Sequence, residues 1–405
     1  MLKRLLAALS CLVVHQAPAQ QVASNPVTLR VATFNIHDIR TTDLVDGEHP
    51  RLKAIAEVIQ RIRPNIILLN EIAYDQRGAP GFKDGDKPGQ NAIRFINNYL
   101  IKPQSGMPPI RYQAFMEPVN TGLPSGFDMD RDGTIATSYT FPAESSDDHT
   151  PTPLPDDAKR YANDCRGYGG FPGQYGMALL VDERLEILSD QARTFRLIPW
   201  DYVSGALLPL KPDNTDWLTQ EEKNVFPLSS KSHWDVPVKL PNASVLHVLC
   251  SHPTPPAFDG PELRNKKRNH DEIRFWRDYI DNAPYIVDDK NEGSGLRRGS
   301  YFVILGDLNA DPKKGDSYKN PIDTQLLSSN KINGEFTPVG DVDLLAKGFA
   351  PEDTADFKLR VDYVLPSASI DILKGGVWRT LPTLSPQAFP SDHFPVWLDI
   401  SVPEP

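Results

Sequence analysis

The sequence predicts one large α/β domain whose strands end in polar residues at a common face. Strand-like apolar runs alternate with amphipathic helical segments along the chain. Five of the strands are followed at once by amide, carboxylate or imidazole side chains. No break in composition separates a second domain, and 405 residues fit a single α/β domain with insertions.

The first elements follow from residue spacing. Residues 27–36 alternate and are rich in β-branched residues, which predicts a strand. Pro50 opens a helix with apolar residues at helical spacing, and this helix stops before Pro64. A short apolar run over 65–69 predicts a buried strand, and residues 92–100 are again helical.

The rest of the chain continues this alternation around a long insertion. Residues 103–173 are loop-rich, because Pro, Gly, Asp and Ser dominate there. A helix is predicted over 261–282. The remaining predicted strands are 175–181, 234–238, 245–251, 301–305, 359–365 and 396–402. We therefore expect a single domain over 26–403, with the insertion on one side.

The composition narrows the class of protein. With 40% hydrophobic and 24% charged residues, the chain has enough apolar material for a globular core. Its 38 prolines predict long, stiff connections. A formal charge of -10 excludes a global basic field, so binding of nucleic acid mainly through phosphate neutralisation is disfavoured.

The N-terminus has the pattern of an export signal. In residues 1–19, the cations Lys3 and Arg4 precede the apolar run 5–14, and an Ala-Pro-Ala cleavage site follows. Lipid attachment at Cys11 is a less favoured alternative. The apolar run is too short to span a bilayer, and we expect no transmembrane segment. The sequence thus predicts a secreted or periplasmic protein, which we expect to be a monomer.

Two cysteines remain after cleavage, Cys165 and Cys250. A disulfide between them is permitted in an oxidising compartment. The alternative is a buried free thiol at Cys250, since this residue lies within a predicted strand.

The polar residues at the strand ends carry the candidate chemistry. They are Asn35, Glu71, His252, Asp307, Asn309, Asp392 and His393, with Asp362 nearby in the chain. A single Asn or Glu after a strand is most often a cap or turn residue. Several in succession favour a site built on a rigid sheet for hydrolysis of a phosphate ester with a hard divalent metal.

These residues lie in motifs that resemble the endonuclease/exonuclease/phosphatase superfamily, in particular its deoxyribonuclease-like branch. The matching segments are Thr33–Ile36, Asn70–Glu71, Ser251–His252, Gly306–Asn309, Val361–Tyr363 and Ser391–His393. The resemblance covers the chain from about Val27 to Val402 in the family's order. It implies a four-layer α/β sandwich, in which two packed mixed β-sheets are flanked by helices.

The resemblance and the side-chain chemistry together imply a metal shell. Glu71 is the best ligand for Mg²⁺ or Mn²⁺, because it is a hard anionic oxygen donor. Asn35 and Asp392 would complete or orient that shell. The family often has Gln before the metal glutamate, whereas this chain has Asn70. His37 stands where the abasic-site enzymes carry an acid, so we expect the shell to differ there.

Catalytic roles follow in the same way. Asp307 would accept a proton from the attacking water or align it, and Asn309 would hold the phosphate or water in line. The carboxylate of Asp362 would fix the tautomer of His393, which could then bind phosphate as a cation or take a proton. His252 would serve as general acid or as a phosphate contact. The glutamate that partners this histidine in deoxyribonuclease is not evident in the sequence.

Weaker signals lie in the loops. Asp128, Asp130 and Asp132 alternate before a glycine as in half of a calcium loop, with a solvated acidic turn as the alternative. Arg264 and Arg268 open the helix after His252, and Lys231 precedes a strand. These cations are candidate substrate-binding residues, or solvated charges.

Trp200 and Tyr202 lie together in a loop, where they could stack on a base or a lipid. Ordinary packing is the preferred interpretation of both side chains.

The sequence therefore predicts an exported, divalent-metal-dependent phosphoesterase, and within that class a phosphodiesterase or nuclease. A phosphatase, or an enzyme acting on a phospholipid or small phosphodiester, is the alternative. A secreted binding protein that keeps the scaffold without turnover is less favoured, because every charged catalytic residue type is retained.

Overall fold

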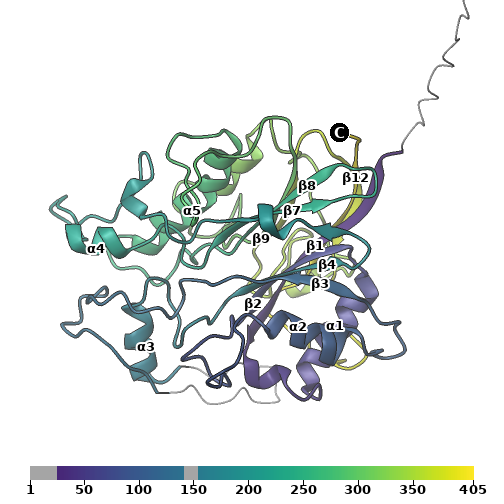
Figure 1. Ribbon diagram of the computed structural model, residues 1–405, viewed down its shortest axis with the longest axis horizontal. Coiled ribbons are helices and arrows are strands. Elements are labelled where there is room, and N and C mark those ends of the chain that lie inside the picture. The colour runs from purple at the N-terminus through teal and green to yellow at the C-terminus, as the bar shows by residue number, and fades with distance from the viewer. Residues whose placement is uncertain (1–24, 141–153) are drawn as a thin grey trace, which may run out of the picture.

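The computed structural model describes residues 25–140 and 154–405. The predicted signal peptide lies outside this part of the chain. Two six-stranded sheets form the centre of the molecule (Figure 1). The first has the order β11 (Asp371–Val377), β12 (Val396–Val402), β1 (Val27–Ile39), β2 (Ile66–Ile72), β4 (Met177–Asp182) and β3 (Tyr112–Phe115). The second has the order β10 (Asp362–Pro366), β9 (Tyr301–Asp307), β8 (Val245–Ser251), β7 (His233–Lys239) and β5 (Glu186–Ile187), and β6 (Arg193–Thr194) also pairs with β7.

Both sheets are mixed. β1 pairs in parallel with β2, and β8 in parallel with β9, while the neighbouring ladders are antiparallel. The sheets face one another, with β1 in contact with β9 and β10. The carboxyl ends of the two parallel pairs therefore meet at one edge of the molecule.

Helices cover the outer faces of the two sheets (Figure 1). The first sheet is covered by α1 (Pro50–Ile62) and α2 (Asn91–Phe95), which continues as a π-helix over Ile96–Leu100. The second is covered by α5 (Arg264–Ile280) and a π-helix over Ile322–Leu327. The remaining short helices are α3 (Asp156–Asn163), α4 (Gln220–Val225) and 3-10 turns at Thr41–Leu44, Ser189–Gln191, Trp200–Tyr202 and Leu345–Lys347. The predicted four-layer sandwich is confirmed.

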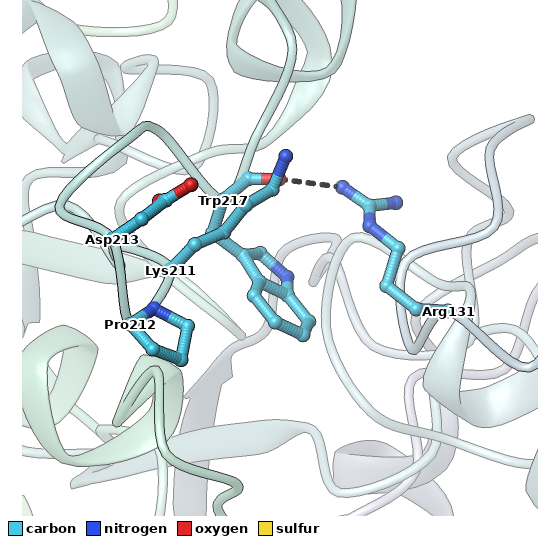
Figure 2. Close-up of a pocket in the computed structure, with 5 residues that line it drawn as sticks. All are labelled: Arg131, Lys211, Pro212, Asp213 and Trp217. Carbon is cyan, nitrogen blue, oxygen red and sulfur yellow. Dashed lines mark hydrogen bonds between the residues drawn. The ribbon is translucent and has the colours of Figure 1, made fainter.

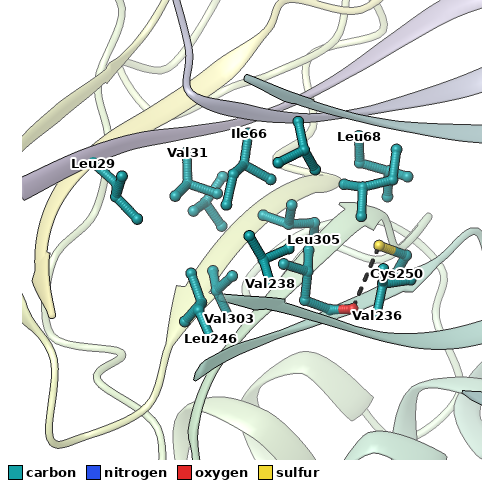
Figure 3. Close-up of a cluster of buried hydrophobic side chains, with 14 of the residues drawn as sticks. Leu29, Val31, Ile66, Leu68, Val236, Val238, Leu246, Cys250, Val303 and Leu305 are labelled. Atoms are coloured by element: carbon teal, nitrogen blue, oxygen red, sulfur yellow. Dashed lines mark hydrogen bonds between the residues drawn. The ribbon is translucent and has the colours of Figure 1, made fainter. Parts of the chain in front are cut away.

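Strand periodicity explains the layers. Leu29 and Val31 of β1 point between the sheets, where Figure 3 shows apolar side chains from both sheets packed together. Ala32 and Phe34 point the opposite way and pack against α1. A strand with apolar layers on both faces is apolar on both, which is why β2 begins with the continuous hydrophobic run Ile66–Leu69.

The predicted elements lie close to their observed positions. α1 begins at Pro50 as expected, and a left-handed Arg63 (φ 52°) ends it before Pro64. β3, β11, α3 and α4 were not predicted. β3 and the two helices are short, and β11 has three exposed residues and two glycines, so none carries a strong apolar pattern.

The cysteines are not bridged: Cys165 and Cys250 are both buried free thiols. Cys250 packs between the sheets (Figure 3), as its strand position suggested. Trp200 is also buried, and its indole Nε1 donates to Asp271 Oδ2 at 2.8 Å, so packing explains this residue. Among the described residues, no helix is long and apolar enough to cross a membrane.

His233, the first residue of β7, makes stability depend on pH. Its ring is buried against Phe275 and Trp276 of α5, with centroids 4.7 and 5.0 Å away. Burial lowers the pKa of His233 to about 4. The unfolded chain, with an ordinary histidine pKa near 6.5, therefore binds the proton first as pH falls. Stability from this residue is complete above about pH 6.5 and is lost between about pH 6.5 and 4.

We therefore expect the free energy of unfolding to fall by on the order of 3 kcal/mol over this window through His233. In His233→Gln, which has no group that titrates there, this part of the slope should disappear. Urea unfolding at several pH values measures it. Equal slopes in the two proteins would show that His233 does not set the dependence.

Candidate active site

The predicted site residues meet where strand ends from both sheets come together. Asn35 and Glu71 lie near the carboxyl ends of the parallel strands β1 and β2. His252 directly follows β8, and Asp307 ends β9. Asp362 begins β10 and pairs with Asp307 in the antiparallel register. His393 precedes β12, which runs antiparallel to β1. Register therefore brings these residues to one edge of each sheet, and the packing of the two sheets brings the two edges together.

Asn35 joins the two sheets at this edge. Its Nδ2 donates to Glu71 Oε1 at 3.0 Å and to Asp307 Oδ2 at 3.1 Å. A second amide, Asn70, accepts from the backbone N–H of Asp307 at 3.2 Å and donates to the carbonyl of Ser251 at 3.4 Å. Because both amides are fully buried, their hydrogen bonds fix the separation of the catalytic strands.

Gly306 allows β9 to approach β8 before Asp307. A side chain at Gly306 would place its Cβ 2.0 Å from the carbonyl oxygen of Ser251, and its φ of 151° lies in a region that L-residues rarely adopt. Only glycine fits here, which is the physical reason for the Gly before Asp307 in the sequence motif.

Asp307 lies at the centre of the site. Its Oδ2 is 3.4 Å from His252 Nε2 and 3.8 Å from His393 Nε2. Burial alone would raise the pKa of Asp307, but His393 and His252 outweigh it and hold the pKa below its ordinary value. The carboxylate is therefore ionised, and it can accept a hydrogen bond from a water molecule.

His393 and Asp362 form the predicted imidazole–carboxylate pair. His393 Nδ1 is 2.8 Å from Asp362 Oδ2, which also accepts from the hydroxyl of Thr354 at 2.7 Å. Burial would lower the pKa of His393, yet Asp362 and Asp307 raise it well above the ordinary value. Burial raises the pKa of Asp362 to about 6, against the opposing effect of His393. The pair therefore holds a proton, and the favoured form has cationic His393.

His252 is in the opposite state. Burial lowers its pKa, and the charge of Lys231 lowers it further, with Asp307 and Glu71 acting in the other direction. Its Nδ1 is buried without a hydrogen-bond partner in the described residues. The glutamate partner missing from the sequence is thus also missing here, and a neutral imidazole is favoured.

Several residues at the site have strained backbones. Non-glycine residues with positive φ include His37 (56°), Asp38 (44°), Glu71 (66°), Tyr175 (57°) and Asn309 (55°). Each such conformation costs on the order of 1–3 kcal/mol and persists only where surrounding contacts impose it. Their concentration at these strand ends is typical of a functional site.

The oxygen donors here fit a hard divalent cation. Each Glu71 oxygen takes one hydrogen bond, from Asn35 Nδ2 or from the backbone N–H of Asp38, and its side chain remains 19% exposed. Asp392 lies beside His37, with Oδ1 2.8 Å from His37 Nδ1. Separately, one candidate ligand atom from each of Asp307, Asp362 and His393 lies within 4.8 Å of the other two. Asp362 Oδ2 is already engaged there, so we favour the Glu71 side for a cation.

His37 was not predicted to contact Asp392. Burial would lower the pKa of His37, but Asp392 and Glu71 raise it. The same contact helps to lower the pKa of Asp392 against the effect of burial. The position where the sequence resemblance led us to expect an acid is therefore occupied by a base, which pairs with a candidate metal ligand.

Lys231 lies next to the site, where it shares a carbonyl partner with Asn309. Its side chain is buried, and Nζ lies 3.5 Å from the carbonyl of Pro253, which also accepts from Asn309 Nδ2 at 3.1 Å. Burial lowers the pKa of Lys231, while the charges of Glu272, Glu71 and Asp307 act to raise it. A buried ammonium with such long contacts is costly unless an anion completes its environment.

Arg264 and Arg268 do not have the free, substrate-facing side chains that the sequence suggested. Arg268 donates to the carbonyls of Pro227, Leu228 and Arg166 at 2.7–2.9 Å and is 3% exposed. Arg264 donates to the carbonyl of Met129 at 2.6 Å. Both pack against the ring of Phe226. The two arginines therefore hold loops against the start of α5. These loops cover the helix terminus, so the arginine side chains are not solvated.

The acidic cluster at the candidate calcium loop contains Asp164 in place of the predicted Asp132. Carboxylate oxygens of Asp128, Asp130 and Asp164 lie within 4.8 Å of one another. Asp132 instead faces Arg160, with Oδ2 3.8 Å from Nε. Backbone N–H groups of Asp132 and Gly133 donate to Asp128, so the turn is also closed by its own hydrogen bonds.

A surface pocket of about 520 Å³ lies elsewhere. Figure 2 shows its lining residues, Arg131, Lys211, Pro212, Asp213 and Trp217. Arg131 is bound by Glu222 at 2.6 Å and by the carbonyl of Trp217 at 2.9 Å. These residues are distinct from those at the strand ends, so this pocket is not the candidate active site.

Residues 165–176 form a second part of the site that the sequence did not indicate. This glycine-rich segment, here termed the bridging loop, ends the predicted insertion. Its Gln174 donates to Asp38 at 3.1 Å, and the carbonyl of Gly176 accepts from the backbone N–H of Glu71 at 2.9 Å. At its other end, Gly167 lies against the carbonyl of Ser230, next to Lys231. The insertion thus returns to connect the two sheets at the site.

Comparison with known proteins identifies the family. A model of the Endonuclease/Exonuclease/phosphatase family matches residues 32–393. The chain belongs to this family. Members of the Endonuclease/Exonuclease/phosphatase family are hydrolases that act on phosphoester bonds, and the acidic clusters described above are compatible with a metal. No curated protein matches the chain.

Solved structures similar to the chain include an endonuclease/exonuclease/phosphatase from Beutenbergia cavernae, with 18% identity over 93% of this chain and 72% of that one and a TM-score of 0.49. The human Nocturnin catalytic domain with a bound sulfate anion has 15% identity over 93% and 95% of the two chains and a TM-score of 0.47. Truncated Caenorhabditis elegans TDP2 has 13% identity over 93% and 98%, with a TM-score of 0.43.

Proposed function

We propose that the protein is an exported, divalent-metal-dependent phosphodiesterase of the nuclease type. The observation that carries this proposal is the Asn35 amide, which holds the carboxylates of Glu71 and Asp307 together while two imidazoles lie within 4 Å of Asp307. Carboxylate oxygens suit Mg²⁺ or Mn²⁺.

Glu71, with Asn35 and Asp392, would hold the cation. When bound, it supplies a Lewis acid that withdraws charge from a phosphate oxygen. Asp307 orients the attacking water through an ionised oxygen. Its neighbour Asn309 has a backbone N–H that donates to Asp307 Oδ1 at 2.9 Å, which fixes the carboxylate plane.

The two imidazoles have different catalytic roles, because the pKa of His252 is lowered and that of His393 is raised. Cationic His393 faces the phosphate and can give its proton to the leaving oxygen. Neutral His252 acts as a hydrogen-bonding group to the phosphate, which is the second of the two roles predicted for it. The water oxygen bonds to phosphorus as its proton passes to Asp307, and the ester P–O bond breaks as the leaving oxygen takes the proton of His393. The products are a phosphate monoester and an alcohol.

The experiment that tests this function measures hydrolysis of bis-p-nitrophenyl phosphate with added Mg²⁺ or Mn²⁺. We expect nitrophenol release that stops when the metal is removed by a chelator and returns when the metal is restored. Release from p-nitrophenyl phosphate alone would move the assignment to a phosphatase. Undiminished release after chelation would contradict the metal requirement.

Lys231→Met should lower activity without lowering the free energy of unfolding. If the buried Lys231 ammonium contacts a bound phosphate, as we propose, kcat/KM should fall by about tenfold or more. Removal of a buried ammonium should leave the free energy of unfolding equal or higher. The matched control is Lys239→Met, an exposed lysine at the far end of β7, the strand that Lys231 precedes. Unchanged kcat/KM in Lys231→Met would refute the contact.

Export is proposed from the sequence pattern of residues 1–19. N-terminal sequencing of protein recovered from outside the cytoplasm tests it. We expect a new N-terminus at residue 20, whereas an intact Met1 on all of the recovered protein would contradict cleavage.

A further inference from the structure

Two short segments at the candidate active site are held by side chains, because no strand pairing reaches them. β8 ends at Ser251, and residues 252–254 are buried but belong to no strand or helix. Residues 228–232, which carry Lys231, are likewise buried and irregular. The positions of His252 and Lys231 therefore depend on the side chains that bind these two segments.

One residue of α5, Glu272, binds both segments. Its carboxylate is fully buried, and Oε1 accepts from the backbone N–H of Ser230 at 2.6 Å and from the hydroxyl of the same serine at 2.9 Å. Oε2 accepts from the backbone N–H of Thr254 at 2.6 Å. Ser230 directly precedes Lys231, and Thr254 lies two residues after His252. Glu272 thus fixes the backbone next to two groups of the site.

The two segments meet at the carbonyl of Pro253. This oxygen lies 3.5 Å from Lys231 Nζ and accepts from Asn309 Nδ2 at 3.1 Å. Glu272 holds the chain on both sides of this contact, one residue before the lysine and one residue after the proline. Burial lowers the pKa of Lys231, and Glu272 is the largest of the charges that act to raise it.

Glu272 belongs to a face of α5 that is turned to the strand ends. Asn269, three residues earlier, donates to the carbonyl of Leu308 at 3.0 Å. Trp276, four residues later, donates from Nε1 to the hydroxyl oxygen of Ser251 at 2.8 Å. Residues at this spacing share one side of a helix. This side of α5 is therefore bonded to the ends of β8 and β9.

We propose that Glu272 is a positioning residue, which holds Lys231 and His252 where they contact the phosphate of the substrate. This inference rests on the proposed phosphodiesterase function and adds to it a buried group behind the site. The Nδ1 of His252 has no partner among the described residues, so none of them orients the ring from that side. Glu272 instead fixes the backbone of the segment that carries the histidine.

The test is hydrolysis of bis-p-nitrophenyl phosphate with Mn²⁺ by Glu272→Gln. The amide keeps the shape of the side chain but turns an NH₂ group toward an N–H donor. We expect kcat/KM to fall about 10- to 100-fold. The matched control is Asp271→Asn, in the neighbouring buried carboxylate of α5, which accepts from Trp200 Nε1 at 2.8 Å and from the backbone N–H of Leu207 at 2.7 Å. It should lose stability in thermal unfolding yet retain nearly normal kcat/KM.

Combination with Lys231→Met distinguishes positioning from general damage. Because Glu272 acts partly through Lys231, Glu272→Gln should cost less in the Lys231→Met background than in the wild-type protein. Ser230→Ala, which removes one hydrogen bond to Glu272, should lower kcat/KM by about threefold or more. This milder variant decides the question if Glu272→Gln does not fold.

Three results would overturn the proposal. They are a loss in Glu272→Gln no larger than in Asp271→Asn, losses that multiply in full with Lys231→Met, and unchanged kcat/KM in Ser230→Ala. A wild-type protein that hydrolyses no diester would refute the proposed function itself, and this inference with it.

Discussion

Replacing Asp307 with asparagine is expected to lower kcat by on the order of 10³-fold. The substitution keeps the shape of the side chain and removes the charge that two imidazoles and Asn35 surround. An amide oxygen is a weaker acceptor than a carboxylate, so the attacking water would lose its orientation, and the cationic His393 would lose one of its two nearby carboxylates. Steady-state hydrolysis of bis-p-nitrophenyl phosphate measures the loss.

A matched control separates this effect from general damage to the sheet ends. Asp182 ends β4, which runs antiparallel to β2, so it lies at the opposite edge of the same architecture. Asp182→Asn should retain nearly normal kcat, although it loses contacts with Arg184. Thermal unfolding of both variants checks that each is folded. A folded Asp307→Asn protein with near-normal kcat would remove Asp307 from the mechanism.

The strand ends could be predicted from sequence because their information is local. A buried strand followed by a polar residue fixes where that residue lies, and parallel neighbours bring their carboxyl ends to one edge. Asn35, Glu71, His252 and Asp307 were therefore found before the structure. Their convergence follows from sheet pairing, which the family resemblance implied.

Residues on loops could not be placed in this way. Arg268 lies in a charge run at the start of a helix, a pattern usual for solvated residues, but the carbonyls of Pro227 and Leu228 cover it. Gln174 belongs to a glycine-rich segment whose course depends on contacts with both sheets. Neither contact has a signal in local spacing, because the partners lie dozens of residues away.

The pairing of His37 with Asp392 shows the same limit. The sequence placed a histidine where related enzymes have an acid, and it identified Asp392 as a ligand candidate. Their contact depends on how the loop before β12 meets the end of β1, where the Ser391 hydroxyl donates to the carbonyl of Asn35 at 2.7 Å. A serine before the Asp–His pair was visible in the sequence, and its role as a tether was not.

Substitutions at His393 and Asp362 are expected to be strongly non-additive. His393→Asn should lower kcat/KM by on the order of 10³-fold, because it removes the cation that faces the phosphate. Asp362→Asn should lower it by about 10–100-fold, since this carboxylate acts by orienting His393 and stabilising its charge. The double variant should be no worse than His393→Asn alone, because Asp362 has no separate contact with the reaction.

A second aspartate–histidine pair, with a buried aspartate and a partly exposed histidine, lies in the second sheet and provides the control. His247 Nδ1 lies 2.8 Å from Asp235 Oδ1, between β8 and β7, in a contact like that of His393 with Asp362. Asp235→Asn should change stability but leave kcat/KM nearly normal, which separates loss of a buried carboxylate from loss of a catalytic partner. If the effects of His393→Asn and Asp362→Asn multiply in the double variant, then Asp362 acts independently of the imidazole. The assignment of a shared proton to this pair would then be wrong.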